Sequence, residues 1–139
     1  MARTSLKLNR YLQLPVGYKR EGDRQTLQLP FRLESRANYR GHTRSKSHRR
    51  AIREQRNVTR MLCQSRMRRP RGPFRFMLVR VAPRTLDPNE NLPMCFKSVA
   101  DGIADWLNVD DRSGLLCEYD QEKAPTPNTY GCLIIMEPA

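Results

Sequence analysis

Long apolar runs are missing from this chain of 139 residues. No segment approaches the ~18 apolar residues that a membrane-spanning helix needs, and residues 1–7 lack the apolar core of a secretory signal. Histidine is scarce, with 2 residues, and none of the 4 cysteines forms a Cys-x-x-Cys pair. These absences argue against a zinc site and a disulfide framework. We therefore expect a cytoplasmic protein whose thiols are reduced and partly buried, namely Cys63, Cys95, Cys117 and Cys132.

Acidic residues are rare in the first part of the chain and abundant in the last. Residues 1–80 contain 22 Lys or Arg against 4 Asp or Glu, whereas residues 81–139 contain 4 against 10. The total net charge is +12. Arginine dominates the basic part, and its planar guanidinium binds phosphate in a bidentate manner. This charge pattern favours phosphate contacts in the first part and metal or pairing chemistry in the second.

The length is typical of one domain with a modest core. We expect residues 1–25 to form a basic N-terminal arm or a short peripheral element, and residues 26–139 to form the domain. Alternation and apolar content predict four strands, at residues 27–33, 74–82, 115–122 and 130–136. Pro30 suggests that the first strand lies at a sheet edge, and the second is apolar enough to be central. Residues 34–46 and 110–114 are expected to be a loop and a turn.

Two helices are predicted, over residues 47–66 and about 92–107. The first has a thin apolar stripe and a broad basic face. The second has Asn91 as a plausible N-cap, and its buried stripe comprises Phe96, Val99, Ala100, Ile103 and Leu107. Gly102 permits close packing against a neighbour. The resulting order of strand, helix, strand, helix, strand, strand predicts a small mixed α/β (α+β) layer fold.

Many like charges on one helix cost stability unless a polyanion is present. We therefore expect nucleic-acid contact along the basic helix and the segments on either side of it. The candidate residues are Arg36, Asn38, Arg40, His42, Arg44, Lys46, Arg49, Arg50, Arg53, Arg56, Arg68, Arg69 and Arg71. An Arg-rich helix also suits the A-form backbone of RNA, so an RNA-binding protein remains an alternative.

An acidic cluster follows the central strand. Asp87 and Glu90 lie in the loop before the second helix, and Asp111 lies just beyond its end. Carboxylates near a bound polyanion favour a divalent cation between them, and Mg²⁺ (or Mn²⁺) takes such oxygen ligands. Lys97 would hold the scissile phosphate. The alternative is structural: the acids cap a turn and a helix end, and Lys97 forms an ordinary i,i+4 pair with Asp101.

The acidic segment also resembles a known family. The residues that carry the resemblance are Leu86-Asp87, Glu90-Asn91-Leu92, Lys97, Asp101-Gly102-Ile103-Ala104-Asp105-Trp106-Leu107 and Asp110-Asp111. They are similar to the RusA-type Holliday junction resolvases, and most similar to the phage-encoded branch. The resemblance covers about residues 27–136.

The resemblance implies a homodimeric, Mg²⁺-dependent endonuclease of mixed α/β fold that makes paired, symmetric cuts in branched DNA. It implies metal ligation by Asp87, Glu90 and Asp111, and phosphate handling by Lys97. It also implies a phage or prophage protein in the cytoplasm of a bacterial host.

The chain departs from the family pattern at the acidic loop. Two residues, Pro88 and Asn89, separate the loop acids where the family has one, and the second acid is Glu90 where aspartate is usual. Asn108 replaces a common glycine. Since Mg²⁺ requires strict ligand geometry, the alternative function is a catalytically impaired RusA-like module that binds nucleic acid or another protein.

Overall fold

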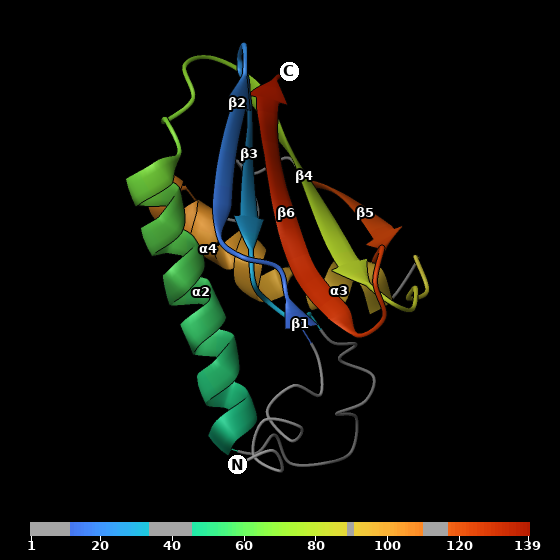
Figure 1. Ribbon diagram of the computed structural model, residues 1–139. Helices are drawn as coiled ribbons and strands as arrows, with labels where there is room; N and C mark the ends of the chain where they lie inside the picture. Colours follow the sequence, from blue (N-terminus) through green and yellow to red (C-terminus); the bar gives the residue numbers. More distant parts are fainter. Residues whose placement is uncertain (1–11, 34–45, 89–90, 110–116) are drawn as a thin grey trace.

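The computed structural model describes residues 12–33, 46–88, 91–109 and 117–139, apart from the side chains of residues 46–48. The described residues form a mixed sheet of six strands with three helices, which confirms the predicted small mixed α/β class (Figure 1). The strands are β1 (Leu12–Gln13), β2 (Gly17–Glu21), β3 (Arg24–Leu29), β4 (Phe74–Ala82), β5 (Cys117–Lys123) and β6 (Thr129–Pro138). The helices are α2 (Lys46–Arg66), α3 (Asn91–Cys95) and α4 (Lys97–Leu107).

The strand order is β2-β3-β6-β4-β5, with β1 paired in parallel to the beginning of β6. β6 is antiparallel to both β3 and β4, and β5 is parallel to β4. The connection between β4 and β5 carries α3 and α4. The predicted strand over residues 74–82 coincides with β4, which lies inside the sheet between β6 and β5, as its apolar sequence indicates.

The prediction of an N-terminal arm is wrong for residues 12–25, which form β1, β2 and the beginning of β3. Glu21 pairs with Arg24, so Gly22 and Asp23 make a two-residue hairpin turn. Gly22 supplies the positive φ of 60° that this turn needs. The expected edge strand is also corrected. β3 ends at Leu29, before Pro30, and lies between β2 and β6.

The helices cover one face of the sheet (Figure 1). On that face Leu27, Ile134 and Leu78 are neighbours in register across β3, β6 and β4, and all three are fully buried. The stripe predicted for the second helix packs against them. Its buried members are Phe96, Val99, Ile103 and Leu107, with Ala100 partly buried.

The second helix is interrupted at Phe96, although its sequence predicts one continuous helix. The thiol of Cys95 donates to the carbonyl oxygen of Leu92, at 3.0 Å. The N–H of Phe96 bonds instead to the carbonyl of Pro93, three residues back, at 3.3 Å. This tighter turn ends α3, and the regular helix resumes at Lys97.

α2 and α4 cross in close contact at Gly102. A Cβ atom there would lie 2.6 Å from the carbonyl oxygen of Arg56 and 2.7 Å from the Cβ of Thr59. Thr59 is fully buried at this crossing, and its hydroxyl donates to the carbonyl of Gln55 within α2. Only glycine allows this approach, which confirms the close packing predicted for this position.

All four cysteines carry free thiols, as predicted; three are buried and Cys117 is partly buried. Among the described residues, no helix has both the length and the apolar content required to cross a membrane.

Candidate nucleic-acid interface and acidic loop

Asp87 lies exposed in the loop that follows β4. The loop is tied to β5 by Gln121, which accepts from the N–H of Leu86 and donates to its carbonyl, both at 2.8 Å. The carbonyl of Asp87 accepts from the N–H of Leu92 in α3, at 2.9 Å. The backbone is therefore fixed on both sides of the exposed carboxylate. Glu90 and Asp111, the other two expected metal ligands, lie outside the described residues.

Arg80 supports the same loop from inside the protein. Its side chain is on the helix-covered face of β4, and the residue is 7% exposed. Nε donates to the carbonyl of Leu33 at 2.9 Å, and Nη1 donates to the carbonyl of Arg84 at 2.7 Å. Arg80 thus joins the end of the 12–33 segment to the start of the acidic loop. The only sequence signal for this role is a charged residue in the middle of an apolar strand.

Lys97 and Asp101 form the i,i+4 ion pair that the sequence allows, with Nζ and Oδ2 3.6 Å apart. The Lys97 side chain is 57% exposed, whereas that of Asp101 is only 16% exposed. Such a pair at the surface contributes little to stability. The ammonium group therefore remains accessible to an anion from solvent.

Of the three expected metal ligands, only Asp87 is among the described residues, and its exposed carboxylate is the kind of oxygen donor that Mg²⁺ prefers. No group of three or more His, Cys, Asp or Glu side chains arranged for a metal occurs within the described ranges. Asp87 is therefore chemically suited to be one ligand of the expected Mg²⁺ ion.

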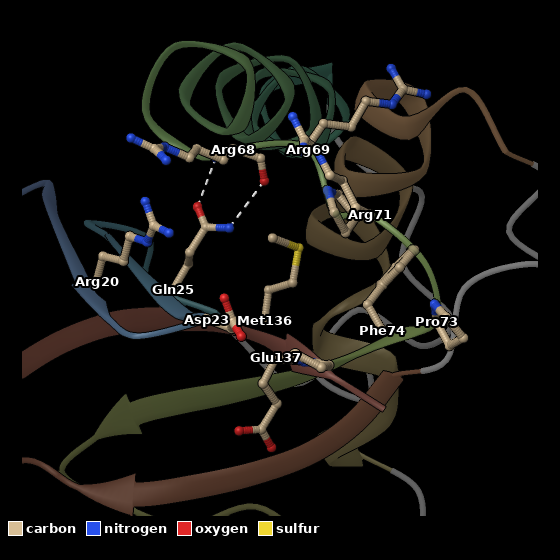
Figure 2. A pocket seen from close by; sticks show the side chains of 12 residues that line it. Arg20, Asp23, Gln25, Arg68, Arg69, Arg71, Pro73, Phe74, Met136 and Glu137 are labelled. Atoms are coloured by element: carbon tan, nitrogen blue, oxygen red, sulfur yellow. Dashed lines mark hydrogen bonds between the residues drawn. The ribbon is translucent and has the colours of Figure 1, made fainter.

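The predicted nucleic-acid contacts fall into two separate groups. Arg49, Arg50 and Arg53 are exposed on the N-terminal half of α2, which begins at Lys46. The second group, exposed on the segment between α2 and β4, consists of Arg68, Arg69 and Arg71 (Figure 2). Apart from Arg56, the other candidates lie outside the described residues and side chains: Arg36, Asn38, Arg40, His42, Arg44 and the side chain of Lys46.

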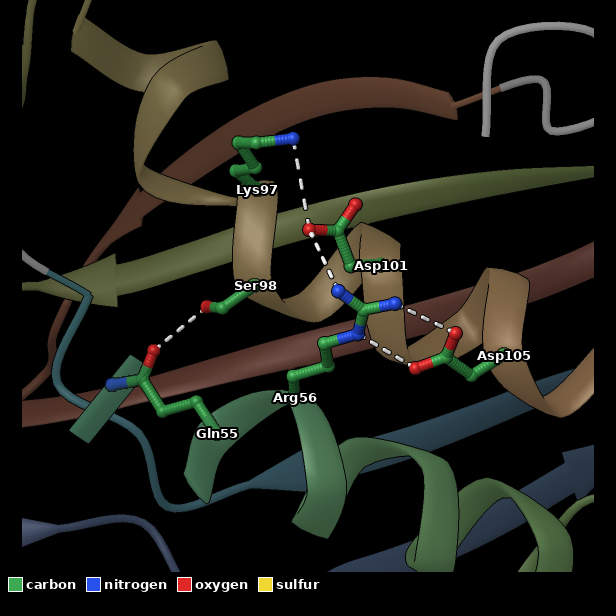
Figure 3. A network of polar contacts seen from close by, with 6 residues as sticks. All are labelled: Gln55, Arg56, Lys97, Ser98, Asp101 and Asp105. Carbon is green, nitrogen blue, oxygen red and sulfur yellow. Dashed lines mark hydrogen bonds and ion pairs between the residues drawn. The ribbon is translucent and has the colours of Figure 1, made fainter. Parts of the chain in front are cut away.

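Arg56 links the two long helices (Figure 3). Its Nε and Nη2 atoms donate to the two carboxylate oxygens of Asp105, at 2.7 and 2.9 Å. Nη1 lies 3.9 Å from Oδ2 of Asp101. Hydrogen bonding to Arg56 lowers the pKa of Asp105, and the charge of Arg56 adds to the effect. The predicted phosphate ligand therefore has a helix–helix bridging role, which sequence reasoning did not reveal.

Further polar contacts join α2 and the segment after it to α4. The hydroxyl of Ser98 donates to Gln55 at 2.8 Å, next to Lys97 (Figure 3). At the other end, Arg69 donates to the carbonyl of Leu107 at 2.7 Å. Residues 55–59 of α2 therefore contact α4 between Ser98 and Asp105, where the two helices cross. Arg49 and Arg53 lie within about two turns of Gln55, on the part of α2 before this crossing.

Neither the protein-family models nor the curated proteins contain a match to this sequence. Among solved structures, the OmpA-like domain of FopA1 from Francisella tularensis subsp. tularensis SCHU S4 is similar, with a TM-score of 0.32 and 14% sequence identity. The alignment covers 94% of this chain and 84% of that domain. A TM-score of 0.32 with 14% identity is too low to indicate a shared family or function.

Proposed function

We propose that this protein is a RusA-type, divalent-metal-dependent endodeoxyribonuclease that resolves Holliday junctions and other branched DNA. The observation that carries the proposal is the exposed carboxylate of Asp87, in a loop whose backbone is held by Gln121 and Leu92. The short helix α3 follows this loop, and the exposed ammonium of Lys97 begins α4 directly after it. The exposed arginines of α2 supply a separate surface for backbone phosphates. Cations that bind phosphate beside a fixed carboxylate suit phosphodiester hydrolysis.

Each group has a role in this proposal. Arg49, Arg50 and Arg53 hold backbone phosphates, and Lys97 exchanges its surface pair with Asp101 for the scissile phosphate. The acids of the loop and of the following turn would hold Mg²⁺ or Mn²⁺; these are Asp87, Glu90 and Asp111. When bound, the metal activates water and stabilises the leaving oxygen. Gln121 keeps the start of the loop in place, so that Asp87 is presented in one position.

Two further features belong to the same proposal. A homodimer explains paired cuts, because two-fold symmetry presents two equal sites to the two strands. A phage or prophage origin, with action in the cytoplasm of a bacterial host, follows from the resemblance of the acidic segment to the phage-encoded branch.

The second candidate is a RusA-like module that binds nucleic acid or a protein partner without cutting. The observation that favours it is the sequence Pro88-Asn89-Glu90, which lengthens the spacer and changes the second acid. Asn89 is neutral and a poorer ligand for Mg²⁺ than a carboxylate.

Cleavage of a labelled four-way junction, beside a linear duplex of the same sequence, tests the proposal. We expect paired cuts in the junction with Mg²⁺ or Mn²⁺, and none with chelator. Asp87→Asn should abolish cutting but retain junction binding. Glu118→Gln is the matched control, because it removes one exposed negative charge from β5, outside the acidic loop. Tight junction binding by the wild type without metal-dependent cutting would refute the enzyme and favour the second candidate.

A further inference from the structure

The second arginine group surrounds a cavity that has no role in the proposed cleavage. The cavity has a volume of about 840 Å³ and lies between the end of α2, the β2–β3 turn and the adjoining ends of β4 and β6 (Figure 2). Pockets for small ligands typically have roughly 300–1,000 Å³. Its charged lining residues are Arg20, Arg68, Arg69, Arg71, Asp23 and Glu137. A cavity of this size is far larger than a phosphate ion requires.

The charges around the cavity favour an anion. Glu137 is already engaged by Arg75, whose Nη2 and Nε atoms donate to one of its oxygens at 2.7 and 2.9 Å. The remaining charged residues of the lining are therefore four arginines and one carboxylate, that of Asp23. The side chains of Arg68 and Arg71 form no hydrogen bond or ion pair with the described residues. Their guanidinium groups remain available to a phosphate, which arginine binds in a bidentate manner.

The rest of the lining is apolar, which a site for phosphate alone does not require. Phe74 and Met136 contribute side chains, together with Pro70, Pro73 and Pro138. The half-buried ring of Phe74 packs edge-on against Phe76, with ring centroids 5.3 Å apart. An aromatic ring and a thioether next to arginines are suited to the flat face of a nucleobase.

Hydrogen bonds hold the arginine segment in place. The buried Gln25 accepts from the N–H of Arg68 at 2.7 Å and donates to its carbonyl at 3.1 Å. The hydroxyl of Tyr18 donates to the same oxygen of Gln25, at 2.8 Å. Arg69 is anchored to the carbonyl of Leu107. The backbone that carries these arginines is therefore preorganised, which reduces the entropy lost when a ligand binds.

We infer that this cavity binds one nucleoside phosphate unit, with the base against Phe74 and Met136 and the phosphate on Arg68 and Arg71. The source is either a free nucleotide or an unpaired nucleotide of a nucleic-acid chain, because a stacked and paired base cannot enter a cavity. β4 begins at the cavity and ends five residues before Asp87, so its nine residues separate the two sites by about 25–30 Å. The inference therefore does not depend on cleavage.

Calorimetric titration of the full chain tests the inference. We expect adenosine 5′-monophosphate to bind, and adenosine and inorganic phosphate to bind at least tenfold more weakly, because each occupies only half of the site. Losing the hydrogen bonds to a charged group costs roughly tenfold or more in affinity, so the Arg68→Ala/Arg71→Ala variant should lose the nucleotide. The Arg84→Ala/Lys123→Ala variant removes the same charge at the other end of β4, outside both arginine groups, and should bind it normally.

Three results would overturn the inference: no nucleotide binding by the wild type, phosphate binding as tight as that of the nucleotide, or equal losses in the two double variants. Thermal unfolding of both variants checks that they are folded. The Asp87→Asn protein should bind the nucleotide like the wild type, so failed cleavage and an empty cavity are distinguishable outcomes.

A fluorescent single-stranded oligonucleotide identifies the source. If the ligand is part of a chain, the oligonucleotide binds more tightly than the mononucleotide, and the mononucleotide displaces it. If the ligand is free, the mononucleotide binds more tightly. The site is rejected for both sources if two results occur together. The wild type binds no mononucleotide, and the oligonucleotide binds the Arg68→Ala/Arg71→Ala variant as tightly as it binds the wild type.

Discussion

Replacing Gly102 by alanine should destabilise the protein, although the same change usually stabilises a helix. In a helix interior, alanine is favoured over glycine by about 1 kcal/mol. At this position the new Cβ would meet the carbonyl oxygen of Arg56 at 2.6 Å and the Cβ of Thr59 at 2.7 Å. Neither atom is the end of a flexible side chain, so no rotamer change relieves the contact. α2 and α4 must move apart.

The magnitude follows from two opposing effects. Overpacking of this kind costs about 1–3 kcal/mol, and separation of the helices also stretches the bidentate pair between Arg56 and Asp105. Subtracting the helix preference of about 1 kcal/mol leaves about 0–2 kcal/mol, and weakening the exposed pair adds up to about 1 kcal/mol. We therefore expect the free energy of unfolding to fall by about 1–2 kcal/mol. With an unfolding entropy of about 2.1 cal/mol/K per residue, the melting temperature should fall by about 3–7 °C.

Thermal and urea unfolding, followed by circular dichroism, measure this loss. Ala51→Gly is the control for helix preference, because Ala51 is exposed on α2, and it should cost about 1 kcal/mol. A melting temperature for Gly102→Ala at or above that of the wild type would refute the close crossing of the two helices.

Three other predictions concern single contacts. Because Arg56 lowers the pKa of Asp105 from 3.8, Asp105→Asn should be less stable than the wild type at neutral pH. The difference should shrink as the pH falls below 3.8, in urea unfolding at a series of pH values; a gap independent of pH would contradict the pairing. Burial raises the pKa of the Cys63 thiol to about 12, so mass spectrometry should find it alkylated in denaturant and protected in the native protein at mildly alkaline pH. Gln121→Ala should speed hydrogen exchange of the Leu86 amide, since its acceptor is lost; unchanged protection would show that other contacts hold the loop.

Local pattern was enough to predict the elements with strong periodicity or composition. β4 is continuously apolar, and α2 has no proline or glycine in its 21 residues, so both were predictable to within a residue. β2 was not, because Gly17–Glu21 contains only one large apolar residue and lies at the sheet edge. The Gly22-Asp23 pair was the available signal for its hairpin.

Irregular local bonding and tertiary contacts account for what sequence patterns did not predict. At the break before Lys97, the N–H of Phe96 bonds to the carbonyl of Pro93, and the Cys95 thiol donates to the carbonyl of Leu92. Gln121 holds the acidic loop at Leu86, 35 positions away in the chain. Arg80 contacts the loop at Arg84 and also bonds to Leu33, 47 positions away. Spacing within one segment predicts the pair between Lys97 and Asp101. It cannot reveal that Arg56 of α2 also approaches Asp101.

The central place of β6 has a consequence for how the protein is made. β6 is the last of the described strands to be synthesised, yet it separates β3 from β4 and pairs with both. Until residues 129–138 leave the ribosome, β3 and β4 each carry an unpaired backbone edge beside apolar side chains, and such edges recruit other chains. Nascent or prematurely terminated chains are therefore the species most exposed to aggregation, and the ones that most need a chaperone.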